Sequence, residues 1–249
     1  MITVNHLYKS FNGQQVLEDI SIVFEPGKTN LIIGSSGSGK TVLLKSIVGL
    51  HDIDKGEIWY GKDLFGSLNF TERKEVRKQM GMLFQGSALF DSLTVEDNVR
   101  FPLDMFSEMG MEEKTERVNF CLKRVNIINS NKLFPAELSG GMKKRVAIAR
   151  AISLNPRYLF CDEPNSGLDP LTAILIDELI KELTEEFCMT TIVNTHDMNS
   201  VMEIGEKVIF ICAGLKCWEG NNKDILHSDN EALNNFVFAN NLAKLLKGK

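Results

Sequence analysis

The sequence lacks any hydrophobic run long enough to cross a membrane. Its longest apolar stretches, such as residues 208–213, fall far short of the ~20 residues that a membrane-spanning helix needs. The N-terminal residues MITVNHLYKSF also lack an apolar stretch followed by a small-residue cleavage site, so we expect no signal peptide. We therefore predict a soluble chain without direct membrane insertion, so that any role at a membrane depends on a partner protein.

Positive charge and paired cysteines are also scarce. The 28 lysine and arginine residues against 33 aspartate and glutamate residues give a net charge of −5, which argues against a nucleic-acid binder. The cysteines form no Cys-x-x-Cys pair, and none stands beside a histidine at the spacing of metal ligands. We therefore predict that all of them are reduced thiols, as in a cytoplasmic protein. They are Cys121, Cys161, Cys188, Cys212 and Cys217.

What the sequence does contain is a regular alternation of short apolar runs with helical patterns. Hydrophobic residues make up 43% and charged residues 24% of the 249 residues, the balance of a globular protein. Strands that alternate with helices predict an α/β fold with a mostly parallel sheet covered on both faces. Buried strands are expected at residues 29–33, 158–161, 190–193 and 208–211, and helices at residues 40–48 and 171–187.

Residues 72–155 interrupt this alternation. They are rich in helical patterns, and only residues 81–84 look like a strand. We therefore predict a helical subdomain, at about residues 94–155, inserted into the sheet-based core.

A glycine-rich motif, G-x-x-x-x-G-K-[ST], follows the predicted strand at residues 29–33. Its glycines let backbone N–H groups turn toward phosphate oxygens at a helix N-terminus, where the helix dipole favours anions. The lysine of such a motif neutralises the β- and γ-phosphates, and the hydroxyl that follows it binds Mg²⁺. We therefore predict a nucleotide site. Its binding residues are Gly34, Ser35, Ser36, Gly37, Ser38, Gly39, Lys40 and Thr41.

Two carboxylates follow the predicted strand at residues 158–161. Asp162 is expected on the metal side of the phosphates, and Glu163 beside it is expected to polarise the attacking water. Phosphoryl transfer depends mainly on positioning and charge neutralisation. One acid on the metal side of the phosphates and one on the side of the attacking water are therefore enough. An isolated Asp-Glu pair often merely opens a loop, here before Pro164, but the phosphate-binding motif in the same chain favours the catalytic interpretation.

The string Leu-Ser-Gly-Gly-Met at residues 138–142 opens another predicted helix. The free N–H groups of Ser139, Gly140 and Gly141 can receive a γ-phosphate for the same reason as the first motif. For such a string alone, a plain helix cap is the alternative. Together with the two preceding motifs, it closely resembles the signature of ABC-transporter nucleotide-binding domains.

This resemblance covers about residues 2–226 and implies a P-loop NTPase core with an antiparallel β subdomain. It also implies Mg²⁺-dependent ATP hydrolysis in a head-to-tail homodimer, where the signature of one copy contacts the ATP held by the other. The expected location is the inner face of the cytoplasmic membrane, beside an integral membrane permease and without a membrane domain fused to this chain. Residues 227–249 are then expected to form a helical tail after a nucleotide-binding domain at residues 1–226.

The resemblance assigns roles to four further residues. Gln85 matches the Q-loop glutamine that senses Mg²⁺ and the lytic water, and His196 matches the switch histidine at the γ-phosphate. Asp169 matches the D-loop aspartate at the dimer seam. Phe11 stands where the family places an aromatic ring on adenine, although a core position at a strand end is the alternative. The implied catalytic residues are Glu163, His196 and Gln85, and the implied Mg²⁺ ligands are Thr41, Gln85 and Asp162.

The sequence departs from the family pattern at two positions. Met142 replaces the usual glutamine of the signature, and a thioether cannot donate a hydrogen bond, which puts a polar contact from this side chain in doubt. Asn165 stands where threonine or serine is more usual, a change that we expect to be mild. The signature with methionine, together with residues 84–90 and 95–99, is similar to the ATPases of Mla-type lipid transporters (MlaF-like). That similarity implies an MlaE-like permease and phospholipid transport across the cell envelope.

Other functions and the C-terminal tail remain open. The same ATPase could serve an ABC transporter for amino acids or small ions. A soluble ABC ATPase acting on ribosomes or DNA is less favoured, because such proteins usually carry two cassettes, a long coiled coil or zinc-binding cysteines. In the tail, a capping-box spacing from Ser228 to Glu231 precedes an amphipathic helix, which packs on its own domain or contacts a second ATPase subunit. The apolar residues of that helix are Leu233, Phe236, Val237, Leu242, Leu245 and Leu246.

Overall fold

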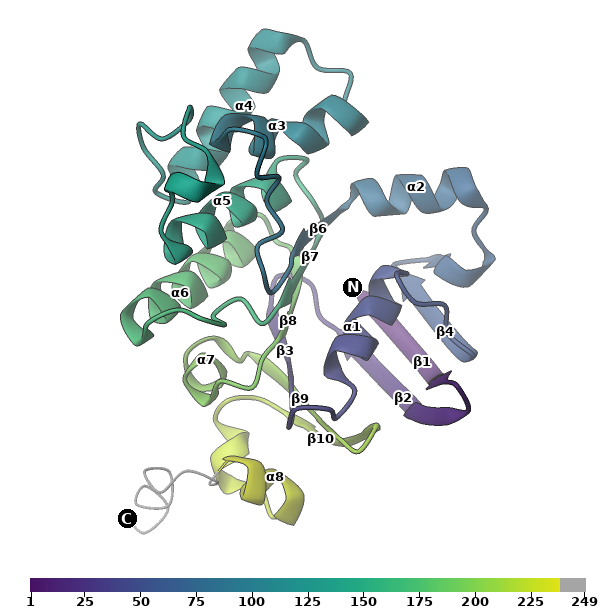
Figure 1. The fold of residues 1–249 in the computed structure, drawn as a ribbon. Helices are drawn as coiled ribbons and strands as arrows, with labels where there is room; N and C mark the ends of the chain where they lie inside the picture. The colour runs from purple at the N-terminus through teal and green to yellow at the C-terminus, as the bar shows by residue number, and fades with distance from the viewer. Residues whose placement is uncertain (238–249) are drawn as a thin grey trace.

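A computed structural model of the chain describes residues 1–237 and shows two sheets with helices packed around them (Figure 1). The larger sheet has six strands in the order β10-β9-β3-β8-β7-β6. All neighbouring pairs are parallel except β9 and β10, which form an antiparallel hairpin. This confirms the predicted α/β fold with a mostly parallel sheet. The strands are β3 (Thr29–Ile33), β6 (Met80–Leu83), β7 (Tyr158–Asp162), β8 (Thr190–Asn194), β9 (Lys207–Cys212) and β10 (Leu215–Gly220).

The three central strands, β3, β8 and β7, are buried along their whole length. Successive side chains of a strand point to opposite faces, so β3 contributes to two cores. Ile32 packs into the core beneath the smaller sheet, whereas Leu31 and Ile33 pack into the core beneath the helices. Burial on both faces explains why these strands read as continuous apolar runs and not as alternating ones.

The smaller sheet is antiparallel, with the strand order β2-β1-β4-β5. It packs against α1 (Lys40–Val48) on one face of the larger sheet, and their side chains form one shared core. This sheet is the antiparallel β subdomain that the family resemblance implies. Its strands are β1 (Ile2–Phe11), β2 (Gln14–Phe24), β4 (Lys55–Tyr60) and β5 (Asp63–Leu64).

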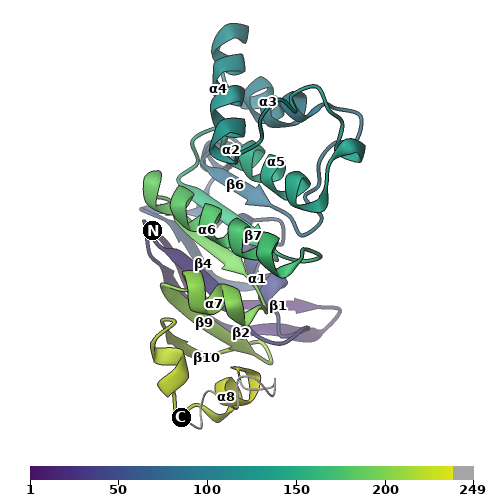
Figure 2. The same cartoon turned by 90° about the vertical axis from the view of Figure 1, so that its left-hand side faces the viewer.

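Helices cover the other face of the larger sheet and extend beyond one end of it (Figure 2). Helices α3, α4 and α5 gather at that end and pack on one another, within the range predicted for the helical subdomain. The exact boundaries of that subdomain stay a prediction. Helix α2 (Phe70–Lys78) lies on the side of the smaller sheet, where its Val76 joins the core shared with α1 (Figure 1). The remaining helices are α3 (Val95–Phe106), α4 (Met111–Arg124), α5 (Gly140–Ile152), α6 (Pro170–Glu186), α7 (Met198–Ile204) and α8 (Glu231–Val237).

Helix α8 packs on its own domain. The ring of Phe236 lies 5.4 Å from that of Phe210 on β9, measured between centroids. The capping-box prediction at Ser228 is wrong, because the helix starts later: the Leu233 N–H donates to the side-chain oxygen of Asn230 at 2.9 Å. The remaining predicted residues of this helix, Leu242, Leu245 and Leu246, lie outside the described residues. None of the helices within residues 1–237 is long and apolar enough to span a membrane.

Two of the five cysteines contradict the prediction of reduced thiols. Cys212 and Cys217 form a disulfide, with their Cα atoms 6.0 Å apart. The antiparallel hairpin of β9 and β10 brings them together across its turn, and a bulge between Lys216 and Trp218 shifts the register beside Cys217. A spacing of five residues in sequence does not show that a hairpin turn lies between two cysteines, so cysteine counting missed the pair.

Candidate active site

The glycine-rich loop joins the end of β3 to the start of α1. At Gly34 the backbone φ is +148°, and a Cβ atom there would overlap the carbonyl oxygen of Ile211 on β9. Gly39, with φ at +105°, caps the N-terminus of α1 without a side-chain hydrogen bond. Both positions need glycine because L side chains rarely adopt these angles. The loop therefore presents backbone N–H groups at a helix N-terminus, as a phosphate site requires.

Lys40 is a buried cation in this loop, with 5% of its surface exposed. Its amine donates to the carbonyl oxygens of Gly34 at 2.8 Å and Ser35 at 3.0 Å. Burial lowers the pKa of Lys40, while the carboxylates of Glu163 and Asp162 act in the opposite direction. The hydroxyl of Ser38 is buried nearby and has no hydrogen-bond partner in the described residues. An enclosed amine and an unsatisfied hydroxyl fit a bound polyanion.

Thr41 and Asp162 meet at the first turn of α1. The Thr41 hydroxyl lies 3.4 Å from the Asp162 carboxylate, and the Asn194 amide donates to both, at 3.1 Å and 2.5 Å respectively. A hydroxyl beside a carboxylate suits the hard oxygen preference of Mg²⁺, which usually takes one or two protein ligands together with water and substrate phosphates. Within residues 1–237 no group of three or more His, Cys, Asp or Glu side chains could hold a metal ion.

Sequence reasoning did not single out Asn194. It ends β8, and strand pairing places it opposite Asp162 at the end of β7. A polar residue that ends a buried apolar strand was the only available signal.

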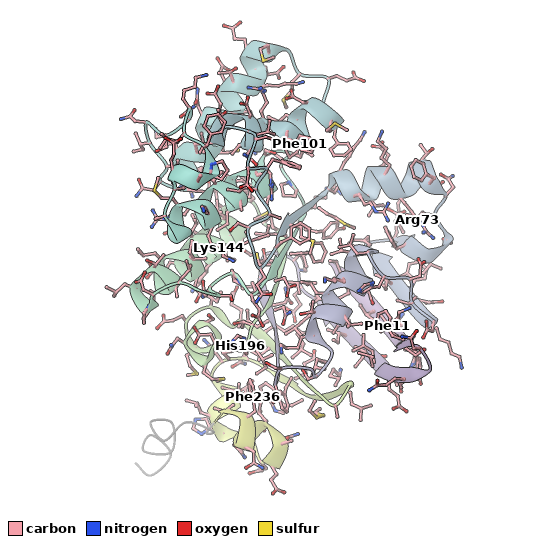
Figure 3. All side chains as sticks on the ribbon, in the orientation of Figure 1. Phe11, Arg73, Phe101, Lys144, His196 and Phe236 are labelled. Atoms are coloured by element: carbon pink, nitrogen blue, oxygen red, sulfur yellow. A yellow bond between two sulfur atoms is a disulfide. The ribbon has the colours of Figure 1, made fainter. Side chains whose placement is uncertain are left out.

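Two of the three predicted catalytic side chains, Gln85 and His196, converge on the third, Glu163. The Gln85 amide donates to one Glu163 carboxylate oxygen at 3.1 Å, and the His196 ring nitrogen Nδ1 lies 3.1 Å from the other. The Gln85 amide also donates to the Ser166 hydroxyl at 3.3 Å. Gln85 thus contacts Glu163 and not the Thr41–Asp162 pair, and its role as a Mg²⁺ ligand stays a prediction. In Figure 3 His196 lies beside α7, on the opposite side of the larger sheet from the smaller sheet, and its side chain is exposed.

The signature string begins α5 and lies in a different cavity from the phosphate loop. The Ser139 hydroxyl caps the helix by accepting from the Met142 N–H at 3.2 Å. This capping hydrogen bond uses the backbone N–H of Met142. It therefore does not depend on whether the side chain at this position is methionine or the usual glutamine. This cavity, of about 300 Å³, is lined by residues 139–142 and 167–169 and by none of residues 34–41. Gly141 sits so close to α6 that a Cβ there would lie 2.7 Å from the Thr172 methyl carbon.

Asp169 caps α6 on the rim of the same cavity. Its carboxylate accepts from the Thr172 N–H at 3.0 Å and from the Thr172 hydroxyl at 2.6 Å. These hydrogen bonds lower the pKa of Asp169. The side chain is therefore held as an exposed anion next to the signature.

Phe11 ends β1 on the smaller sheet (Figure 3). The residue is 39% exposed, so the alternative of a core phenylalanine is wrong. The ring makes an edge contact with His51 at 5.3 Å between centroids, and the Lys9 amine lies 4.9 Å from its centre. Its role in stacking on adenine stays a prediction.

Asn165, the second departure, joins two helices. Its amide donates to the Asp177 carboxylate on α6 at 2.8 Å and to the Ser200 hydroxyl on α7 at 3.0 Å. Burial raises the pKa of Asp177 to about 6. Sequence reasoning missed Asp177 and Ser200, because nothing near them in sequence marks them as partners of this loop.

The fold and the phosphate loop together are those of a nucleotide-binding protein of the P-loop class. The chain belongs to the ABC transporter family, whose family model matches residues 17–166. As in that family, the chain is an ATPase that drives transport. The methionine import ATP-binding protein MetN of Clostridium tetani is 39% identical over 90% of this chain and 70% of its own length. The probable ribonucleotide transport ATP-binding protein mkl of Mycobacterium bovis is 34% identical over 95% of this chain and 66% of its own length.

Solved structures agree with this assignment. The ATP-binding cassette MJ0796, in a dimeric post-hydrolysis state bound to ADP and Pi, matches with a TM-score of 0.81 and 31% identity. The match covers 89% of this chain and 99% of that one. The cbiO1 protein of Clostridium perfringens, part of the cbiONQ transporter complex, matches with a TM-score of 0.85 and 27% identity over 99% and 98% of the two chains.

Proposed function

We propose that the chain is the ATP-hydrolysing subunit of a phospholipid ABC transporter, paired with an MlaE-like permease at the inner face of the cytoplasmic membrane. The observation that carries the catalytic part is the convergence of Gln85 and His196 on the Glu163 carboxylate, close to the buried amine of Lys40. Such a cluster holds a carboxylate where it can orient a water molecule toward a phosphate.

In this proposal the central site residues divide into phosphate, water and metal contacts. Lys40 and the loop amides hold the β- and γ-phosphates, and Glu163 polarises the attacking water. His196 contacts the γ-phosphate and keeps Glu163 in place through their contact. A Mg²⁺ ion held by Thr41 and Asp162 would neutralise charge on the phosphate oxygens.

The separate signature cavity supports a homodimer. Residues 139–141 line a cavity without any phosphate-loop residue, so one copy does not bring both motifs to the same ATP. Two copies arranged head to tail would bring the signature of each to the ATP of the other. The similar cassette MJ0796 is described as dimeric.

An apolar groove supports a permease partner. It has a volume of about 700 Å³ and lies between α2, β6, α3 and α5, next to the loop that carries Gln85. Cations of α2 line one side of it. A helix with an apolar face and acidic flanks fits such a groove. The aromatic lining consists of Phe70, Phe84, Phe90, Phe101 and Phe106.

The lipid cargo is supported by the signature with Met142 and by residues 84–90 and 95–99, which are similar to Mla-type ATPases. Amino-acid transport is the second candidate, because a methionine importer subunit is 39% identical to this chain. Isolation of the complex through a tag on this chain separates the two. We expect an MlaE-like permease with bound phospholipid, and a methionine-type permease with a binding protein would contradict the lipid proposal.

Glu163→Gln tests the catalytic assignment. Loss of the carboxylate removes the group that polarises water but leaves the phosphate contacts, so kcat should fall by about a hundredfold or more while ATP affinity stays within about twofold. Steady-state hydrolysis and nucleotide titration measure the two. Glu178→Gln, at an exposed position of α6, is the matched control and should hydrolyse ATP like the wild type. Turnover near the wild-type rate in Glu163→Gln would exclude Glu163 as the base.

A further inference from the structure

Lys144 is a buried lysine of α5 to which none of the roles above gives a function. Only 4% of its surface is exposed. Its amine donates to the backbone carbonyl of Gln85 and lies 3.5 Å from the backbone carbonyl oxygen of Glu163. Burial lowers the pKa of Lys144, and the nearby negative charges of Asp162 and Glu163 oppose that effect. A buried cation costs free energy relative to an apolar side chain, so packing does not account for a lysine here.

The two carbonyls belong to the two residues whose side chains contact each other. The Gln85 amide donates to the Glu163 carboxylate at 3.1 Å, and the Lys144 amine holds both backbones behind that contact. Glu163 also has a backbone φ of +47°, which is uncommon for a residue other than glycine. Its N–H donates to the Asn194 carbonyl at 2.8 Å. Glu163 is thus held by β8 through its N–H and by α5 through its C=O.

The same helix carries the signature at its N-terminus. Ser139 caps α5, and Lys144 follows five residues later, which is about 7.5 Å along a helix that rises ~1.5 Å per residue. Figure 3 shows Lys144 where α5 faces the centre of the molecule. One helix therefore joins Ser139 of the signature to the Lys144 amine that lies against the Glu163 backbone.

Arg150 extends this connection. Its guanidinium donates to the carbonyl oxygens of Ser87 at 2.8 Å and Ala88 at 2.7 Å. Those two residues have φ values of +63° and +48°, so the loop after Gln85 is held in an uncommon backbone conformation by α5. A displacement of α5 would therefore move the Gln85 loop with it.

We propose that Lys144 is a positioning residue that couples the two ATP sites of the dimer. When the signature end of α5 contacts the ATP of the partner copy, Lys144 sets the Gln85–Glu163 pair of its own copy for hydrolysis. The proposal rests on the roles proposed above for Glu163 and for the signature. It adds a link between the two ATP sites of the dimer. This link runs through the Lys144 amine and the backbone carbonyls of Gln85 and Glu163.

The test uses the complex isolated through a tag on the full chain, with Lys144→Met, Lys144→Arg and Lys143→Met. In Lys144→Met we expect kcat to fall at least about tenfold and the Hill coefficient for ATP to fall to 1, with ATP affinity within about twofold. Lys144→Arg keeps the cation and its donors, so kcat should return to within about threefold of the wild type. Lys143→Met is the matched control. Within residues 1–237 the Lys143 side chain makes no hydrogen bond or ion pair, so this variant should match the wild type.

Wild-type kcat and Hill coefficient in Lys144→Met would overturn the proposal. A loss of kcat that Lys144→Arg does not restore would also overturn it. The same holds if kcat, ATP affinity and melting temperature all fall together in Lys144→Met, because that result marks a purely structural role. If Lys144→Met does not fold, Lys144→Gln, which keeps a neutral donor, takes its place with the same outcomes. Glu163→Gln measured in parallel separates the two proposals. If Glu163→Gln still hydrolyses ATP, the catalytic assignment of Glu163 is wrong. If Glu163→Gln loses turnover but Lys144→Met keeps it, only the coupling role of Lys144 is wrong.

Discussion

Asp177 is a carboxyl group whose ionisation the fold disfavours. It is 2% exposed, and burial raises its pKa from 3.8 to about 6 despite hydrogen bonds from Ser200 and Asn165. The folded protein therefore binds this proton more tightly than the unfolded chain does. The resulting stabilisation is present below about pH 4 and is lost as the pH rises through about 6.

Asp177→Asn should remove this pH dependence. We expect the free energy of unfolding of the wild type, relative to the variant, to fall by roughly 2 kcal/mol between about pH 4 and pH 7. Denaturant unfolding at several pH values measures the difference. Glu178→Gln, its exposed neighbour, serves as the control and should run parallel to the wild type. Parallel curves for wild type and Asp177→Asn would show that Asp177 titrates normally.

The roles of single residues could be predicted from the sequence where their neighbours in the chain form a recognisable motif. Lys40, Thr41 and Asp162 belong to strings in which a few neighbours in sequence specify a phosphate or metal contact. Asn194 and Lys144 could not be predicted in this way, because their contacts join residues far apart in sequence. Asn194 meets Asp162 through the register of two parallel strands, and Lys144 reaches the Gln85 carbonyl from another helix.

At the level of elements, α1, β3, α6 and the inner strands lie where the apolar runs predicted them. The strands of the smaller sheet were expected only from the family resemblance. Their period-two alternation is broken by register shifts in β1 between Val4 and Leu7 and again between Leu7 and Lys9. Positive φ values at His6 and Asp19 accompany this irregular pairing. Such a strand shows no regular alternation in its sequence.

The β9–β10 hairpin supports the phosphate loop. In its turn, the Gly214 N–H donates to the Ser38 carbonyl at 3.1 Å, and the Gly214 carbonyl accepts from the Glu18 N–H at 2.9 Å. The Cys212–Cys217 disulfide closes this turn. A cross-link of this kind lowers the conformational entropy of the unfolded chain. For so short a loop, this stabilises the folded protein by about 2 kcal/mol.

Cys217→Ser should therefore lower the free energy of unfolding by about 2 kcal/mol under oxidising conditions and make it insensitive to reductant. Chemical unfolding with and without reductant measures both effects. Cys188→Ser changes an exposed free cysteine and is the control. Equal stability of oxidised wild type and Cys217→Ser would contradict the stabilising role of the disulfide.

For the molecule as a whole, the alternation of strands and helices was enough to predict the fold class. The apolar groove beside Gln85 was not predictable, because α2, β6 and α3 create it only when they pack together. Its aromatic rings come from residues between 70 and 106, and several of them are exposed.

Phe101→Asp should weaken permease binding without changing ATP binding. Phe101 lies in the groove and is 37% exposed, so a charge there disfavours an apolar partner helix without opening a core cavity. We expect recovery of the permease with the tagged chain to fall at least about fivefold. Phe120→Asp, on α4 and 41% exposed, lies outside the groove and is the control. Equal permease recovery in both variants would place the partner elsewhere.

The bulge in β10 has a consequence for how copies of this protein meet. β10 is the outermost strand of the larger sheet at that side, and an outer strand can pair with a strand from another molecule. Here the bulge beside Cys217 interrupts the regular row of hydrogen-bonding groups, and the Asn230 amide already donates to the Cys217 carbonyl at 2.9 Å. The ion pair between Lys216 and Glu219 adds charge to the same strand. These features of β10 disfavour edge-to-edge pairing between the larger sheets of two copies.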